Sequence, residues 1–251
     1  MGPLSHSKQT INYKTIEGEV LSADIHRPND DKIYPGVILV HGGSWGGRSR
    51  EDMSGIAEFL ASHGFVVMNI SYRFAPKHRY PAQIEDAHAA IEWFKKNAEK
   101  LRLDPTRLGG WGYSAGGHII TQWAFLESKK QQAPALKAIV SGGAPYDLSW
   151  YPFSPIITHL LDGFRDQRIQ EYKVASPINH VSSHAPAMLM IHAEQDRLVE
   201  AVQSSNLQNK LRDVGVDARL SLVSYWGHAW TFLMADEAVM DGLKFLKEKL
   251  H

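Results

Sequence analysis

The chain has 251 residues, of which 43% are hydrophobic, and its 27 basic residues balance its 27 acidic residues. This is the composition of an ordinary globular protein with enough apolar side chains for a sizeable core. Balanced charge without a basic patch argues against nucleic acid or an anionic membrane surface as the main partner. The lack of cysteine excludes disulfides, thiolate nucleophiles and cysteine-based metal sites.

The N-terminal part predicts an antiparallel hairpin. Residues 10–16 and 19–26 alternate apolar and polar side chains on either side of Glu17 and Gly18, a pattern typical of two strands joined by a tight turn. The start of the chain lacks the apolar core of a secretory signal, and no apolar run approaches the roughly 18 residues of a membrane span. A cytoplasmic location without a membrane span is therefore the default expectation.

After the hairpin, short apolar runs alternate with amphipathic stretches. The runs predict strands at 36–41, 65–70, 107–111, 138–141, 187–192 and 219–225. The amphipathic stretches predict helices at 53–63, 83–101, 115–126, 199–214 and 236–250. This alternation predicts an α/β fold with a mostly parallel sheet of about eight strands, antiparallel only at the N-terminal hairpin, and helices on both faces. A single domain over 1–251 is expected, with the irregular stretch at 143–186 as a candidate cap or lid.

One glycine-rich stretch suggests a nucleophile. Ser114 lies between Gly112 and Gly116, after a predicted strand and before a predicted helix. G-x-S-x-G in that context is typical of a nucleophile elbow, a tight turn that needs small neighbours such as Ala115. The pattern is short enough to occur by chance in roughly one such chain in ten, so the hypothesis depends on the rest of the sequence.

Other candidate residues also follow predicted strands, where ligands gather in an open α/β sheet. Gly42 and Gly43 follow the first strand after the hairpin, Asp196 follows the fifth, and His228 follows the last. A serine hydroxyl needs a base and a carboxylate that orients the base. The chain order Ser114, Asp196, His228 supplies these groups and is the order expected for α/β hydrolases.

Four motifs together resemble those of α/β-hydrolase esterases. They are HGGSW at 41–45, GYSAGG at 112–117, HAEQDRLV at 192–199 and GHAW at 227–230. The resemblance covers about residues 19–248 and is greatest to the hormone-sensitive-lipase-like and the bifunctional feruloyl and acetylxylan esterase branches. It implies the α/β-hydrolase fold and a serine esterase.

The resemblance also implies a role for each site residue. Ser114 is expected to be the nucleophile, His228 the general base and acid, and Asp196 the orienting acid. The backbone N–H groups of Gly42, Gly43 and Ala115 are expected to form the oxyanion hole. Many lipases of this type have a third glycine where this chain has Ser44, which leaves the substrate open. His41 is expected to brace the loop.

Several residues compete with the triad. Glu194 is the alternative acid, although the spacing before Arg197 favours Asp196. Among the other histidines, those near the fifth of these strands are interpreted as surface or packed residues: His180, His184 and His192. Asp86 and His88 are interpreted as a solvated helix face. No metal-binding pattern is present, so neither a metal nor another cofactor is expected.

Aromatic residues suggest where substrate binds. The 143–186 stretch is rich in them, and they either shape a pocket or pack a long loop against the sheet. The candidate substrate-binding residues are Trp45, Tyr113, Tyr146, Trp150 and Trp230. The loop containing Arg73, Lys77 and Tyr80 is interpreted as structural.

The leading hypothesis is a serine carboxylesterase that cleaves small acetyl or aryl esters through an acyl-enzyme intermediate. An arylformamidase similar to kynurenine formamidase is the alternative, because the HGG-x-W form also appears in those enzymes and the 143–186 stretch is aromatic. A catalytically silent fold would lack a triad residue or a hole glycine, and a prolyl-oligopeptidase type needs a large accessory domain. The expected partner is a small-molecule ester, and a homodimer is compatible with the sequence.

Overall fold

The structure, a computed structural model, describes residues 2–224 and 236–251. It begins with an antiparallel hairpin of β1 (His6–Ile16) and β2 (Glu19–Pro28). Glu17 and Gly18 have φ angles of 51° and 77°, as the preferred two-residue hairpin turn requires. The predicted hairpin is confirmed, with both strands longer than expected.

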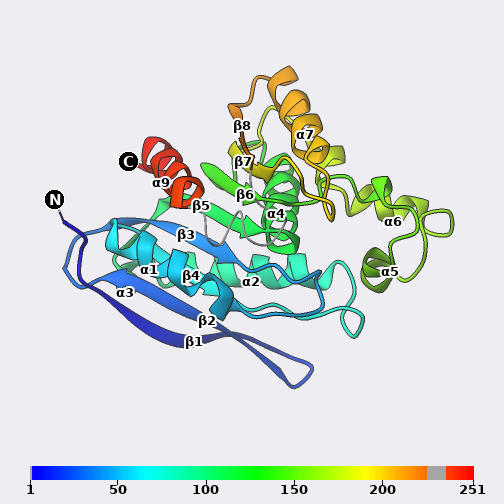
Figure 1. Ribbon diagram of the computed structural model, residues 1–251. Coiled ribbons are helices and arrows are strands. Elements are labelled where there is room, and N and C mark those ends of the chain that lie inside the picture. The colour runs from blue at the N-terminus through cyan, green and yellow to red at the C-terminus, as the bar shows by residue number, and fades with distance from the viewer. Residues whose placement is uncertain (1, 225–235) are drawn as a thin grey trace.

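The hairpin is one end of an eight-stranded sheet of order β1-β2-β4-β3-β5-β6-β7-β8 (Figure 1). The other strands are β3 (Tyr34–Val40), β4 (Val66–Ile70), β5 (Leu103–Tyr113), β6 (Ala138–Gly142), β7 (Ala187–Ala193) and β8 (Ala218–Val223). β2 pairs antiparallel with β4, and every pair from β4 to β8 is parallel. The mostly parallel sheet with an antiparallel N-terminal hairpin is therefore confirmed, and the parallel strands end at one edge.

Helices cover both faces of this sheet (Figure 1). They are η1 (Arg50–Met53), α1 (Ser54–Ser62), α2 (Ala82–Lys96), α3 (Ala98–Leu101), α4 (Ala115–Gln131), α7 (Val202–Asp213) and α9 (Asp236–Leu250). The helix predicted at 83–101 is in fact two, which meet at Asn97, where φ of −98° and ψ of 13° depart from helical values. None of the described helices is long and apolar enough to cross a membrane.

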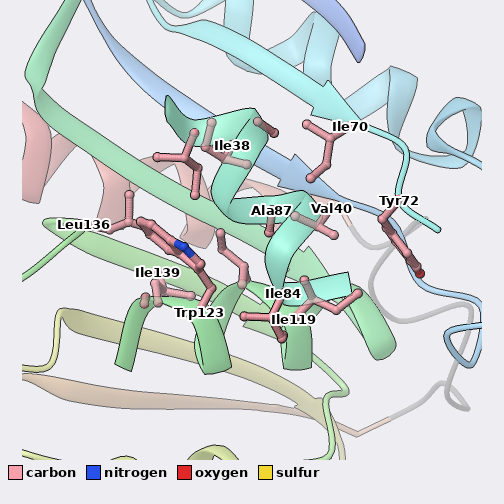
Figure 2. Close-up of a cluster of buried hydrophobic side chains, with 14 of the residues drawn as sticks. Ile38, Val40, Ile70, Tyr72, Ile84, Ala87, Ile119, Trp123, Leu136 and Ile139 are labelled. Carbon is pink, nitrogen blue, oxygen red and sulfur yellow. The ribbon is translucent and has the colours of Figure 1, made fainter. Parts of the chain in front are cut away.

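Strand alternation divides the core into two layers. Val37 and Leu39 of β3 face the cluster that α1 and α9 complete, whereas Ile38 and Val40 face the cluster of α2, α4 and α7. Figure 2 shows Ile38 and Val40 with Ala87 of α2. Since β3 is buried on both faces, its sequence is a continuous apolar run.

Gly242 of α9 lies against the fully buried ring of Trp111 in β5. A Cβ at Gly242 would lie 2.7 and 2.9 Å from ring carbons of Trp111, too close for van der Waals contact. We expect Gly242→Ala to lower the free energy of unfolding by about 1–3 kcal/mol despite alanine's higher helix propensity, measured by urea denaturation. Gly55→Ala in α1 is the matched control, because no described atom lies within 4 Å of the added Cβ; equal effects of the two substitutions would contradict the packing argument.

Residues 143–186, here called the cap segment, are not irregular as predicted. They contain η2 (Leu148–Trp150), α5 (Pro155–Leu161), α6 (Ile169–Val174) and η3 (Pro177–His180) (Figure 1). Side-chain caps start two of these elements: Asp147 accepts from the Ser149 N–H, and Ser154 accepts from the Ile157 N–H. The helices are too short for apolar periodicity to reveal them.

The loop between β4 and α2 holds the cap segment. The Tyr80 N–H donates to the Leu160 carbonyl at 3.1 Å, and Arg79 pairs with Asp162 at 2.9 Å. Arg73 of this loop donates to the Asp86 carboxylate of α2 at 2.9 Å, which supports the interpretation of the loop as structural. The cap segment is thus tied to an element outside its own sequence range.

Candidate active site

Ser114 lies on the tight turn that its motif predicts, between β5 and α4. Its φ of 51° and ψ of −120° are uncommon for a residue with a side chain. The turn depends on glycine: a Cβ at Gly112 would overlap the backbone of Gly116, and a Cβ at Gly116 would overlap the backbone of Val40. The Ser114 N–H donates to the Gly142 carbonyl at 2.7 Å, which fixes the turn to the end of β6.

The stretch after β3, residues 41–47, lies against this turn and is called the glycine loop. A Cβ at Gly42 would lie 3.3 Å from the Cβ of Ser114, so the two segments are in close contact. Gly43, Ser44 and Trp45 have φ angles of 116°, 55° and 58°. Two of these residues are not glycine, so the loop holds a conformation that costs roughly 1–3 kcal/mol per residue.

Two donors hold the Gly42 carbonyl. The His41 Nδ1 lies 2.6 Å from this oxygen and must donate to it, and the Tyr72 hydroxyl is shared between this oxygen at 3.3 Å and the His41 carbonyl at 3.2 Å. The His41 and Tyr72 rings stack at 4.5 Å, and burial lowers the pKa of His41. Because a trans peptide points its C=O and N–H to opposite sides, these contacts fix the direction of the Gly43 N–H. They agree with the interpretation of His41 as a brace.

Asp196 is the buried acid after β7. Its Oδ1 accepts from the backbone N–H groups of Leu198 and Val199, both at 2.9 Å. Burial raises the pKa of Tyr113, the residue that precedes Ser114, and the negative charge of Asp196 raises it further. Glu194, the alternative, is exposed, whereas Asp196 is buried at 6% exposure.

His228 and Trp230 lie outside the described residues, so the expected base is not placed. His192 is fully buried, with Nδ1 at 2.7 Å from the Ser204 hydroxyl and Nε2 at 2.8 Å from the Val199 carbonyl. It is a packed residue, as interpreted. His180 Nε2 lies 2.7 Å from the Val174 carbonyl in the cap segment.

A cleft of about 410 Å³, including its open mouth, joins these segments. The glycine loop, the Ser114 turn, the loop after Asp196 and the cap segment all contribute to it. Its lining residues are Ser44, Trp45, Ser114, Ala115, Pro145, Tyr151, Ser154, Ile156, Ile157, Leu198 and Val199. Most of these side chains are apolar, so the cleft suits an uncharged group.

Three predicted substrate-binding residues do not line this cleft. Tyr113 points into the core cluster of α1 and α9, as strand alternation requires. Tyr146 is fully buried and donates to the Ser141 hydroxyl at 2.8 Å, and Trp150 is exposed with its indole 3.4 Å from Glu200. Trp45 does line the cleft.

The aliphatic lining residues were missed. Ile156 and Ile157 come from α5, and Val199 follows the acid. Aromatic content does not indicate these aliphatic positions, whereas Ser154 followed by Pro155 is a sequence signal for a helix start.

The interpretation of Asp86 as a solvated residue was wrong. Asp86 is fully buried, and its carboxylate lies 2.9 Å from Arg73 Nε and 2.6 Å from Lys14 Nζ. A buried carboxylate is tolerated because two cations neutralise it. His88 is exposed and accepts from the Trp123 indole at 3.3 Å. Among the described residues, no group of acidic or histidine side chains could hold a metal ion.

The mostly parallel sheet, with a strained serine after β5, a glycine loop after β3 and a buried aspartate after β7, defines an α/β-hydrolase fold. The chain belongs to the BD-FAE family, whose model matches residues 23–211. It is 29% identical to Esterase LipC of Mycobacterium tuberculosis over 236 residues, which cover 85% of this chain and 58% of LipC. The chain spans about half the length of the curated relatives that it matches.

Solved structures agree on the fold. One is a truncated form of a carbohydrate esterase from gut microbiota, with a TM-score of 0.87, 26% identity and 99% of both chains covered. Another is esterase 2 of Thermogutta terrifontis with propionate bound, with a TM-score of 0.81, 21% identity, 96% of this chain and 93% of that chain covered. The predicted α/β-hydrolase fold is confirmed.

Proposed function

We propose that the protein is a serine carboxylesterase that hydrolyses esters with short acyl groups through an acyl-enzyme intermediate. The observation that carries the proposal is the strained Ser114 turn, which lines an apolar cleft together with the glycine loop. Membership of the BD-FAE family and the similarity to named esterases support it.

In the proposed reaction, the Ser114 oxygen attacks the ester carbonyl carbon while its proton passes to His228. The negative charge on the carbonyl oxygen is stabilised by the N–H groups of Gly42, Gly43 and Ala115. Ala115 suits this role because it is the first residue of α4, where the N–H has no acceptor within the helix and the helix dipole is positive. His228 then donates the proton to the departing alcohol oxygen, and the carbon–oxygen bond to that alcohol breaks.

The second half of the reaction releases the acid. Water attacks the acyl carbon and gives a proton to His228, and the bond to the Ser114 oxygen breaks as that oxygen is reprotonated. Asp196 keeps His228 in the orientation for both transfers. The position of Asp196 is fixed in turn by the hydrogen bonds that its Oδ1 accepts from two backbone N–H groups.

The lining of the cleft favours esters with a short acyl group. Ile157 and Val199 line the cleft together with Ser114, and both are apolar and largely buried. The similar Thermogutta structure holds propionate. A series of p-nitrophenyl esters from acetate to octanoate tests this, and we expect kcat/KM to be highest at two to four carbons, on the order of tenfold above octanoate.

The reaction class needs its own test. A fluorophosphonate probe should label the wild-type protein on Ser114, as located by peptide mass spectrometry, and N-formylkynurenine should be turned over far more slowly than phenyl acetate. Rapid turnover of the formyl compound with slow ester cleavage would instead indicate the arylformamidase. Absence of both labelling and ester cleavage would reject the proposal.

The Gly42 brace gives a further prediction. We expect Tyr72→Phe to lower kcat for acetyl esters about 3- to 10-fold, because the hydroxyl that the His41 and Gly42 carbonyls share is lost and the Gly43 N–H is less well directed. KM should change little. Tyr34→Phe, which removes a hydroxyl that donates to Asp30, is the control, and a similar loss of kcat in both variants would contradict the brace.

A further inference from the structure

Three side chains at intervals of four residues lie along one face of α4: Ser114 at its N-cap, then His118, then Gln122. His118 and Gln122 are almost fully buried, and neither belongs to the proposed reaction. Most buried polar groups of this kind have hydrogen-bond partners, and here both His118 nitrogens and the Gln122 amide nitrogen have them. The contacts of these two residues lead in two directions, to the glycine loop and to the cap segment.

The His118 ring has one definite proton arrangement. Its Nδ1 lies 3.1 Å from the Trp45 indole nitrogen, which can only donate, so Nδ1 is an acceptor. Its Nε2 lies 2.8 Å from the Ala175 carbonyl, which can only accept, so Nε2 carries the hydrogen. Burial lowers the pKa of His118 to about 4. The ring is therefore neutral at physiological pH, with both nitrogens satisfied.

The two hydrogen bonds of His118 thus link Trp45 of the glycine loop to Ala175 of the cap segment. At its Trp45 end, this link contacts a strained segment. Trp45 is a non-glycine residue at φ 58°, directly after Ser44 at φ 55°. Such a conformation persists only where surrounding contacts determine it. Two contacts do so: the Trp45 carbonyl accepts from the Ala75 N–H at 2.9 Å, and the indole donates to His118, whose ring it also meets edge-on at 5.1 Å.

The other end of the link lies in the cap segment. Ala175 is the C-cap of α6 and is fully buried. One turn further along α4, Gln122 donates to the Val174 carbonyl at 2.7 Å and to the Tyr80 hydroxyl at 3.1 Å. The end of α6 is thus fixed to the same helix face that begins at Ser114.

We infer that His118 is a positioning residue, which through Trp45 holds the glycine loop against Ser114 and through Ala175 ties that loop to the cap segment. The inference rests on the proposed function, because the glycine loop is the proposed source of two oxyanion donors. His118 touches no substrate. Its effect is to fix the position of the glycine loop relative to Ser114, because both are then attached to α4.

Two substitutions separate the ends of the link. In His118→Asn the Oδ1 atom can take the place of Nδ1 and still accept from Trp45, while the bond to Ala175 is lost. In His118→Gln the Nε2 atom can still donate to Ala175, while the acceptor for Trp45 is lost. We expect His118→Gln to lower kcat for p-nitrophenyl acetate about 10- to 100-fold with KM within about 2-fold, and His118→Asn to lower kcat about 3-fold.

The chain contains a matched control. The Trp123 indole donates to Nδ1 of His88 at 3.3 Å, a contact of the same two groups on the surface between α2 and α4. His88→Gln removes that contact and is expected to leave kcat and KM as in the wild type. Melting temperatures of all three variants show whether a loss of kcat follows from a general loss of stability.

A spectroscopic measurement tests the link without depending on ester cleavage. In ¹⁵N-labelled protein, the Trp45 indole proton, assigned by its absence in Trp45→Phe, should exchange slowly in the wild type and in His118→Asn, and at least about tenfold faster in His118→Gln. Equal exchange in the wild type and His118→Gln would overturn the link to Trp45. Equal loss of kcat in the Asn and Gln variants would overturn the positioning role. Failure of the wild type to cleave esters would reject the proposed function alone, because the exchange rates would still decide the link.

Discussion

Replacing Ser114 by alanine is expected to lower kcat for p-nitrophenyl acetate by on the order of 10⁵-fold. The substitution removes the only atom that can form the proposed acyl-enzyme. Alanine meets the same steric cost at φ 51° as serine does, so the turn should persist and the melting temperature should change by only a few degrees. Steady-state kinetics and thermal unfolding measure the two effects.

The control for this variant is Ser183→Ala, at an exposed serine of the cap segment. It should retain wild-type kinetics and fluorophosphonate labelling, whereas Ser114→Ala should lose both. Activity that survives in Ser114→Ala at the wild-type level would reject the nucleophile. Activity lost together with the folded structure would instead mean that the turn needs the hydroxyl.

Asp196→Asn is expected to lower kcat by about 10³- to 10⁴-fold. The asparagine Oδ1 can still accept from Leu198 and Val199, so the loop should keep its shape. The second atom becomes a donor, however, and favours the wrong tautomer of His228. The loss should therefore appear in kcat with little change in stability, as measured by kinetics and urea denaturation.

Glu194→Gln provides the comparison, because Glu194 lies two residues away and is exposed. Near-wild-type kinetics are expected for it. If Glu194→Gln were the impaired variant and Asp196→Asn the active one, the acid would have been misassigned. Loss of activity in both to the same degree would point to a disturbance of the shared loop.

The sequence predicts the sheet well because β-strands that are buried on both faces leave a strong local signal. The run of Val37 to Val40 is apolar throughout, since alternate side chains enter two different core layers. The Ser114 turn is also predictable, because only glycine fits the close approach of α4 to β3 at Gly116. Each feature leaves a local signal in the sequence, an apolar run for β3 and the G-x-S-x-G motif for the turn, although the contacts behind both are long-range.

Other features of the fold and of the candidate site depend on long-range contacts that leave no pattern in the sequence. Asp86 has the sequence context of a surface residue, and only the approach of Lys14 and Arg73 from other elements makes its burial tolerable. Tyr146 follows a strand, as a pocket residue would, but turns inward to Ser141. The short cap helices are stabilised by packing and by end caps, so hydrophobic periodicity does not reveal them.

The anchoring of the cap segment has a consequence for protein engineering. The 143–186 segment is continuous in the chain and looks like a module that could be exchanged to change substrate range. Its contacts argue against a simple exchange. Tyr80 and Arg79 bind it from the loop between β4 and α2, and His118 and Gln122 bind it from α4. A graft that keeps the recipient's own loop and helix face would lose these anchors, so the unit to transplant is the cap segment with matched residues at 79, 80, 118 and 122.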